Sequence, residues 1–247
     1  MTGSNLLRHI SPTKRDSLPD GPPMSVKLRP MKNSSPFTRN SSTRARQGAP
    51  VVAGAKPTSH IKGMPGQVRL IGGQWKRTKL SVADKPGLRP TPDRVRETLF
   101  NWLGQDLTGW RCVDAFSGTG ALGFEAASRG AQDVCMVEHD ASLVDQLRKL
   151  QAQLQASMVN VVRGNGLTVL KQLAPGSIDV IFLDPPFDAT VLGVALAAAA
   201  LAVKPGGFVY LESPTAWTDA LLTELGLVVH RHMKAGAVHA HLLRRPA

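Results

Sequence analysis

The segment Asp114-Ala-Phe-Ser-Gly-Thr-Gly-Ala-Leu-Gly123 lies between an apolar run that predicts a strand and a run that predicts a helix. Its last six residues match G-x-G-x-x-G, the pattern of turns that lie against a bound nucleotide or nucleoside. Glycine lets the main chain turn sharply there and approach the ligand closely. Glu138 ends the next predicted strand, at a spacing where a carboxylate accepts hydrogen bonds from ribose hydroxyl groups. The pattern predicts a nucleoside cofactor at one edge of a parallel sheet.

Two cofactors fit this loop, nicotinamide dinucleotide and S-adenosylmethionine. The dinucleotide carries a pyrophosphate, which a helix N-terminus attracts but which the nearby carboxylate of Asp114 opposes. S-adenosylmethionine carries an ammonium and a sulfonium group, which suit the same carboxylate. The loop favours S-adenosylmethionine, and a nicotinamide-dependent oxidoreductase stays open as an alternative. The candidate cofactor-binding residues are Asp114, Phe116, Ser117, Gly118, Thr119, Gly120, Glu138, His139 and Asn165.

A second motif, Asp184-Pro-Pro-Phe187, follows the apolar run Ile178–Leu183, which predicts a strand buried on both faces. The two prolines stiffen the turn and remove two N–H donors. An exocyclic amine of a purine fits this turn, because Asp184 and the Pro185 carbonyl can accept its two N–H bonds while Phe187 stacks on the base. These three residues are the candidate catalytic residues. Guanine and adenine both carry such an amine, so the turn leaves the choice of base open.

Strands and helices alternate after residue 105, which predicts an α/β domain with a mostly parallel, seven-stranded sheet and a C-terminal antiparallel hairpin. Ligands bind open sheets where the winding of the chain reverses, so we expect the strands that end at Asp114 and Asp184 to flank that crevice. The predicted helices are Asp93–Leu103, Ala121–Arg129, Ser142–Ala156, Thr190–Val203 and Trp217–Leu225. The predicted strands are Arg111–Phe116, Asp133–Glu138, Asn160–Arg163, Ile178–Leu183, Phe208–Glu212, Leu227–Lys234 and Val238–Arg244.

Before this core, residues 68–82 predict a hairpin or two short strands around Gly72 and Gly73. Thr91 is expected to cap the first helix, with Pro92 at its first position. That helix places Arg94 and Arg96 away from its apolar face, where both can be solvated charges.

Two upstream stretches resemble one known family closely. They are Arg69-Leu-Ile-Gly-Gly-Gln-Trp-Lys-Arg-Thr-Lys-Leu80 and Leu88-Arg-Pro-Thr-Pro-Asp-Arg-Val-Arg-Glu-Thr-Leu-Phe-Asn-Trp-Leu103. Together with the two motifs above, they are similar to the bacterial RsmD-type 16S rRNA guanine-N2 methyltransferases, over about residues 67–245. The resemblance implies a Rossmann-like, class I S-adenosylmethionine-dependent methyltransferase domain over 65–247, with a hairpin and helix over 65–104 and the core over 105–247.

The resemblance also implies a substrate, one guanine of 16S rRNA in a small-subunit particle or assembly intermediate. It implies that Thr91, Arg94 and Thr98 lie near the methionine end of the cofactor or near the target nucleotide. Many relatives carry an acidic residue where this chain has Asn165, which the sequence places near the adenine. The alternative to RNA contact for the basic hairpin is an edge element protected by charge. The candidate RNA-binding residues are Arg69, Trp75, Lys76, Arg77, Lys79 and Arg89.

Charge is concentrated at the N-terminus. The chain carries a formal net charge of +12, of which residues 1–64 contribute +9. This arm is rich in Ser, Pro and Gly, so it is expected to be disordered and to favour a polyanion such as nucleic acid. A solvated tail is the alternative. No run predicts a membrane span, and a cytoplasmic monomer is expected.

Cys112 and Cys135 fall in predicted strands, without the spacing of a disulfide or metal framework. Four histidines alternate on the last two strands, at positions 230, 232, 239 and 241. They are expected to face each other in pairs across the turn. Polar positions on an edge hairpin are favoured over a metal site or a patch that becomes cationic at low pH.

Overall fold

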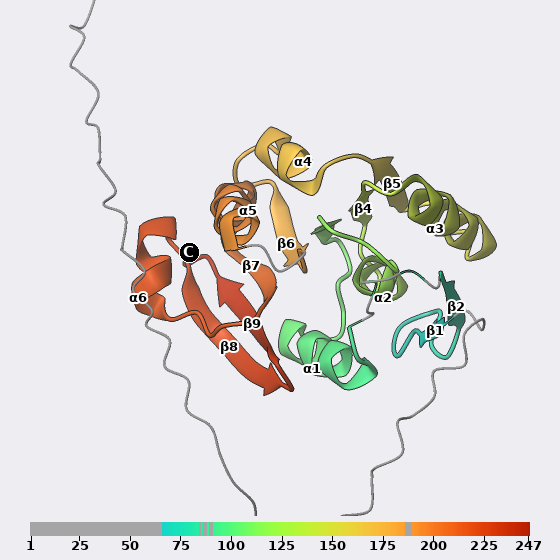
Figure 1. The fold of residues 1–247 in the computed structure, drawn as a ribbon, viewed down its shortest axis with the longest axis horizontal. Coiled ribbons are helices and arrows are strands. Elements are labelled where there is room, and N and C mark those ends of the chain that lie inside the picture. Colours follow the sequence, from blue (N-terminus) through green and yellow to red (C-terminus); the bar gives the residue numbers. More distant parts are fainter. Residues whose placement is uncertain (1–65, 84, 86–87, 89–90, 186–188) are drawn as a thin grey trace, which may run out of the picture. The chain divides into compact units, whose positions relative to one another are not determined.

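The structure, a computed structural model, describes residues 66–83, 85, 88, 91–185 and 189–247. A seven-stranded sheet has the order β5-β4-β3-β6-β7-β9-β8, and a separate two-stranded sheet pairs β1 with β2 (Figure 1). The strands are β1 Gly66–Arg69, β2 Lys79–Val82, β3 Arg111–Asp114, β4 Asp133–Glu138, β5 Val159–Arg163, β6 Ile178–Leu183, β7 Val203–Ser213, β8 Val228–Ala235 and β9 Val238–Arg244. The helices are α1 Asp93–Leu103, α2 Ala121–Ser128, α3 Ala141–Gln153, α4 Gly166–Gln172, α5 Ala189–Ala202 and α6 Asp219–Leu222, which a 3₁₀ turn over Thr223–Leu225 extends.

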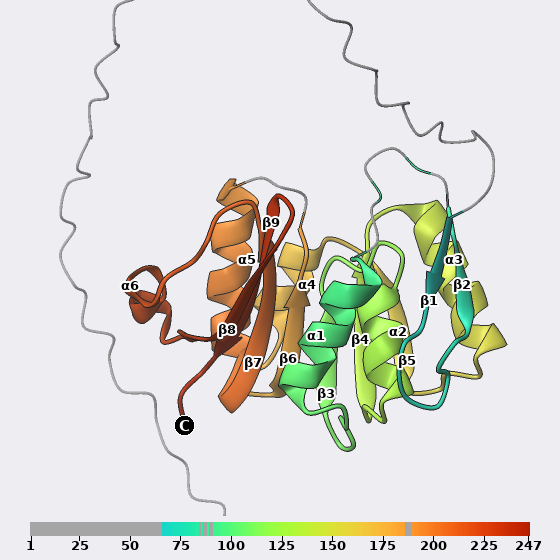
Figure 2. The same cartoon turned by 90° about the horizontal axis from the view of Figure 1, so that it is seen from below.

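Both faces of the large sheet are covered. Helices α1 and α2 lie on one face and α4 and α5 on the other (Figure 2). Successive residues of β6 alternate between the two cores: Val180 and Phe182 belong to one apolar cluster, and Ile181 and Leu183 to the other. This alternation follows from the two-residue period of a strand, and it explains why the sequence of β6 is almost continuously apolar.

The winding of the chain reverses between β3 and β6. From β3 the sheet grows outward through β4 and β5, and the chain then returns to place β6 on the other side of β3. Asp114 pairs with Phe182 across these two strands. The predicted neighbourhood of the strands that end at Asp114 and Asp184 is therefore confirmed, together with the seven-stranded sheet and its antiparallel C-terminal pair.

The small hairpin is anchored to the end of α2. The buried carboxylate of Glu125 accepts hydrogen bonds from the backbone N–H groups of Ile71 (2.8 Å) and Gly72 (3.0 Å). The Ser128 hydroxyl donates to the Gly72 carbonyl at 2.6 Å. A Cβ atom at Gly73 would lie 1.8 Å from the Ser128 carbonyl oxygen, so only glycine allows this approach.

Several local predictions were wrong. Helix α4 was missed, because its seven residues are short and only Gly166 and Leu170 among them are buried. Thr91 does not cap α1; Pro92 occupies the cap position and no side chain caps the helix. Arg96 is fully buried rather than solvated. The arm over 1–64 lies outside the described residues, and among those that are described no helix is long and apolar enough to cross a bilayer.

Gly120 offers a test of how tightly the loop is packed. Its φ is +78°, and a Cβ there would come within 2.5 Å of Leu147 and 2.9 Å of Phe124. Gly109 has the same backbone conformation, φ +80°, with nothing within 4 Å. Gly109→Ala should cost ~1–2 kcal/mol for the left-handed backbone alone, whereas Gly120→Ala should cost a further ~1–3 kcal/mol from overpacking. Urea unfolding of both variants measures the difference, and equal losses would show that the loop has room.

Candidate active site

The glycine loop is held to the end of β4 by its own acidic residue. The Glu138 carboxylate is buried and accepts hydrogen bonds from the N–H of Gly118 (2.9 Å) and the N–H of Asp140 (2.8 Å). The loop also bonds to β4 through the Ser117 N–H, which donates to the Val137 carbonyl at 2.9 Å. These bonds bring the predicted ribose-binding acid and the predicted cofactor loop together at one edge of the sheet.

Asp114 lies beneath this loop. It is buried, and its Oδ2 accepts from the Gly123 N–H at 3.0 Å, in the first turn of α2. The Ser117 hydroxyl donates to the Asp114 carbonyl at 3.0 Å. Burial, with a smaller contribution from the charge of Glu138, raises the pKa of Asp114 to about 7 despite the hydrogen bond from Gly123. A cationic group placed here would offset the cost of the buried carboxylate.

Asp184 lies directly after β6, next to a third acidic residue that the motifs did not identify. Glu212 is buried near the end of β7, the strand beside β6. Burial, followed by the charges of Glu212 and Asp114, raises the pKa of Asp184 well above its usual range. Burial also raises the pKa of Glu212. We call Asp114, Asp184 and Glu212 the acidic cluster; its members come from three adjacent strands.

Two hydroxyl groups position Glu212. Its Oε1 accepts from the Tyr210 hydroxyl at 2.8 Å and from the Thr91 hydroxyl at 3.0 Å. Burial and the neighbouring Glu212 raise the pKa of Tyr210 well above its usual range, so Tyr210 stays a hydrogen-bond donor. Thr91 thus contacts Glu212, and its place near the cofactor or the target nucleotide stays a prediction. The signal that points to Glu212 in the sequence is an acid directly after the run Phe208-Val-Tyr-Leu211 near the end of β7.

Asn165 is brought close to the glycine loop by the residue that follows it. A Cβ at Gly166 would lie 2.2 Å from the Ala115 carbonyl oxygen and 3.0 Å from the Phe116 ring. The start of α4 can therefore lie against the segment after β3 only because residue 166 is glycine. Asn165 caps α4, with its side-chain oxygen accepting from the Thr168 N–H at 3.2 Å.

The remaining predicted residues fall into two groups. Thr119 is buried in the loop, His139 is exposed with Nδ1 3.0 Å from the Glu138 carboxylate, and the Thr98 hydroxyl donates to the carbonyl of exposed Arg94 at 2.9 Å. Phe187 and Arg89 lie outside the described residues. The contacts of all these residues with a ligand stay predictions.

The predicted RNA-binding residues of the hairpin are mostly exposed. Arg69, Lys76, Arg77 and Lys79 are all exposed, and Arg69 pairs with Asp93 at 3.3 Å. Trp75 is only half-exposed, because its ring packs against the core. The hairpin therefore presents a basic surface on a firmly anchored element.

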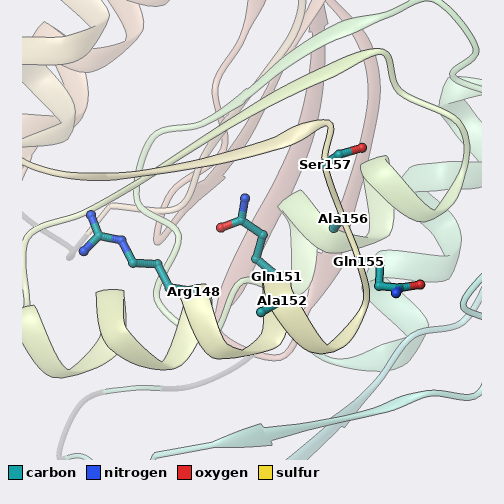
Figure 3. A pocket seen from close by; sticks show the side chains of 6 residues that line it. All are labelled: Arg148, Gln151, Ala152, Gln155, Ala156 and Ser157. Atoms are coloured by element: carbon teal, nitrogen blue, oxygen red, sulfur yellow. The ribbon is translucent and has the colours of Figure 1, made fainter.

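A surface depression of about 470 Å³ lies away from this site, at the C-terminal end of α3 and the turn before β5 (Figure 3). Two of its side chains bond to the edge strand of the sheet. The Arg148 guanidinium donates to the Val161 carbonyl at 3.5 Å, and the Gln151 amide donates to the Val159 carbonyl at 2.5 Å. These bonds satisfy carbonyl groups of the edge strand β5, and the depression is lined by none of the predicted site residues.

Comparison with known proteins agrees with this geometry. The family described as "Conserved hypothetical protein 95" matches residues 68–244. "Ribosomal RNA small subunit methyltransferase D" of Escherichia coli K12 is 49% identical over 122 residues, covering 49% of this chain and 61% of that protein. The protein of the same name from Haemophilus influenzae is 38% identical over 179 residues, covering 67% of this chain and 93% of that protein. The solved structure of yhhF from Escherichia coli matches with a TM-score of 0.63 and 36% identity, covering 74% of this chain and 99% of that one.

This chain belongs to the RsmD family, the conserved hypothetical protein 95 family. The predicted relationship is confirmed, and with it the class I methyltransferase fold; the relatives named above carry the name of an rRNA methyltransferase, and the chain spans 61% of the length of the Escherichia coli protein. Within this RsmD-family domain, the glycine loop and the acidic cluster lie at the carboxyl ends of the strands where the winding reverses, as the fold requires of a ligand site.

Asp114→Asn should show how much stability the protein loses by burying the charge of this carboxylate. Asparagine keeps an acceptor for the Gly123 N–H but carries no charge. In the folded protein the pKa of Asp114 is raised to about 7, whereas in the unfolded chain it has the ordinary value of an aspartate. The wild-type protein therefore loses stability as the pH rises from that ordinary pKa through about 7. The variant should therefore be more stable by roughly 1–3 kcal/mol near pH ~8, with a gain that disappears near pH ~4.

Urea unfolding across this pH range measures the effect, with Asp145→Asn on the exposed side of α3 as the control. A difference that does not change with pH would contradict a buried, charged Asp114.

Proposed function

We propose that this protein transfers a methyl group from S-adenosylmethionine to the exocyclic N2 of a guanine in small-subunit rRNA. The observation that carries the proposal is the acidic cluster at the reversal point, with Asp184 beside Asp114. The names of its relatives, which are ribosomal RNA small subunit methyltransferases, support the substrate class. A small-subunit particle or an assembly intermediate is the natural source of that rRNA.

The residues present suit S-adenosylmethionine. Two carboxyl groups with raised pKa values, Asp114 and Asp184, lie in a buried region, and a ligand that carries ammonium and sulfonium charges would stabilise their ionised forms. A pyrophosphate would meet the same charges unfavourably. In this proposal Asp114, Ser117 and Thr119 hold the methionine end, Glu138 the ribose, and Asn165 with Phe116 the adenine. The cofactor supplies an electrophilic methyl group, so the protein chiefly aligns the acceptor.

Asp184 aligns that acceptor. Its carboxylate and the Pro185 carbonyl accept the two N–H bonds of the amine, which turns the nitrogen lone pair toward the methyl group. Phe187 stacks on the base. Glu212 lies beside Asp184 and its charge disfavours the ionised form of Asp184. An N–H donor from the base would stabilise that ionised form.

Asp184→Asn should abolish most methyl transfer. The amide keeps the size of the side chain but replaces one acceptor oxygen with an N–H donor, which faces the amine unfavourably. We expect kcat to fall by ~10²-fold or more, while the affinity for S-adenosylmethionine changes little. The measurements are transfer of labelled methyl groups to small-subunit particles from a deletion strain, and calorimetry with the cofactor. Glu224→Gln, a remote exposed acid, is the control.

Full activity of Asp184→Asn would remove the assigned role. Mass spectrometry of the nucleosides identifies the base, and N6-methyladenosine in place of N2-methylguanosine would overturn the choice of guanine. Calorimetric binding of a nicotinamide dinucleotide with none of S-adenosylmethionine would overturn the cofactor.

The basic hairpin is proposed to hold rRNA by its phosphates. Lys76 and Lys79 are exposed and lie on an element fixed to α2, so Lys76→Ala with Lys79→Ala removes two charges with little effect on the fold. RNA affinity should fall, and the slope of log K against log salt should flatten by about 1–2, since each phosphate contact contributes ~0.7–0.9. Filter binding over a range of salt concentrations tests this. The control is the double variant Lys149→Ala with Lys171→Ala, which removes two exposed charges elsewhere. Equal salt slopes in the two double variants would contradict the hairpin's role.

A further inference from the structure

Three of the four C-terminal histidines converge on one side of the β8–β9 hairpin. His232 on β8 is the cross-strand partner of His241 on β9. His239 lies two residues earlier on β9, on the same face of the strand. One ring nitrogen from each of His232, His239 and His241 lies within 4.8 Å of the others. We call these three residues the histidine triplet.

The fourth histidine is separated from the triplet by an irregularity in β8. The strand register shifts between Val229 and Arg231, so the alternation predicted from His230 to His232 is broken. The His230 ring instead lies against Phe208, with ring centroids 5.5 Å apart. The expectation that four histidines face each other in two pairs was therefore wrong.

Two rings of the triplet already share a hydrogen bond. His232 Nε2 lies 2.9 Å from His239 Nδ1, and the ring planes differ by only 5°. At this distance one of the two nitrogens carries the proton between them. A divalent ion that replaced this proton would be ligated by both rings after a small rotation.

His241 supplies the third nitrogen from the interior. Its ring is fully buried and lies 4.5 Å from the ring of His232, centroid to centroid. The backbone N–H of Trp217 donates to His241 Nε2 at 3.0 Å, while His241 Nδ1 is buried without a hydrogen-bond partner among the described residues. Metal ligation through Nδ1 would leave the bond from Trp217 in place and would give the buried imidazole a second interaction.

The three side chains are of one ligand type, and their burial runs from exposed His232 through half-buried His239 to fully buried His241. Neutral imidazole is the ligating form, and three imidazoles with one open position suit zinc, cobalt and related ions. The exposed ammonium of Lys234 opposes a cation, and solvent screens its charge.

We propose that His232, His239 and His241 bind one divalent transition-metal ion of the zinc class, with a water molecule at its fourth position. The ion would link β9 to the edge strand β8. Because His241 accepts a hydrogen bond from Trp217, the ion would also stabilise the segment before α6. On β9, His241 and His239 pair with Leu211 and Ser213, the neighbours of Glu212, so metal binding and methyl transfer are measured separately.

The test uses the full chain without an added histidine tag, stripped with a chelator and titrated with Co²⁺ and then with Zn²⁺ as competitor. We expect one Co²⁺ per chain with the intense visible absorption of a four-coordinate ion, displaced by Zn²⁺. His239→Ala and His232→Ala should each weaken the affinity by at least ~10-fold. His230→Ala is the matched control, because it removes a histidine from the same strand and should leave binding unchanged.

Thermal unfolding gives an independent readout. Zn²⁺ should raise the Tm of the wild type and of His230→Ala, and it should leave His239→Ala unchanged, because only binding to the folded state stabilises. Absence of the visible bands, or equal affinities of His239→Ala and His230→Ala, would overturn the site and would assign any bound metal to other residues of the chain.

Discussion

The cost of removing three neighbouring carboxyl groups from water is the constraint around which this site is built. Asp114, Asp184 and Glu212 end three neighbouring strands, and burial raises the pKa of each. Two of them are stabilised by hydrogen bonds: the Gly123 N–H donates to Asp114, and the Tyr210 and Thr91 hydroxyls donate to Glu212. Such a cluster lowers the stability of the ligand-free protein. The same unfavourable energy makes the site selective for ligands that bring positive charge or N–H donors, because those ligands relieve it.

Close backbone approach gives the site its shape. Gly120 and Gly123 allow the first turn of α2 to pack against Met136 of β4, where a Cβ on either residue would lie under 3 Å from that side chain. Gly166 does the same for the start of α4 against Ala115. The glycines of the loop therefore differ in function. Gly120 and Gly123 allow α2 to pack closely against β4, whereas the N–H of Gly118 donates a hydrogen bond to Glu138 at the end of β4.

The sequence predicts those parts of the molecule that depend on local pattern. The sheet, the bounds of α1, β4, β6 and β9, and the placement of Asp114 beside Glu138 and Asp184 follow from hydrophobic period and motif spacing. Contacts between segments that are distant in the sequence cannot be predicted from local pattern. Glu212 meets Thr91 across 121 positions of sequence, and Arg96 is buried because it bonds to the Arg69 and Thr91 carbonyls (2.9 and 3.1 Å). His230 lies apart from the histidine triplet because the strand register shifts between Val229 and Arg231. A prediction that assumes strict alternation along the strand cannot include such a shift.

Arg96 connects the two halves of the proposed activity. Its guanidinium bonds to the Arg69 carbonyl at the end of β1, to Asp93 at the start of α1, and to the Thr91 carbonyl. The Thr91 hydroxyl in turn bonds to Glu212 of the acidic cluster. One buried cation thus fixes the basic hairpin relative to the acidic site. A polyanion held by the hairpin would then meet the acids at a defined position, although their charges repel it. One element can therefore bind RNA while another aligns its base, because a short chain of hydrogen bonds fixes the two elements relative to each other.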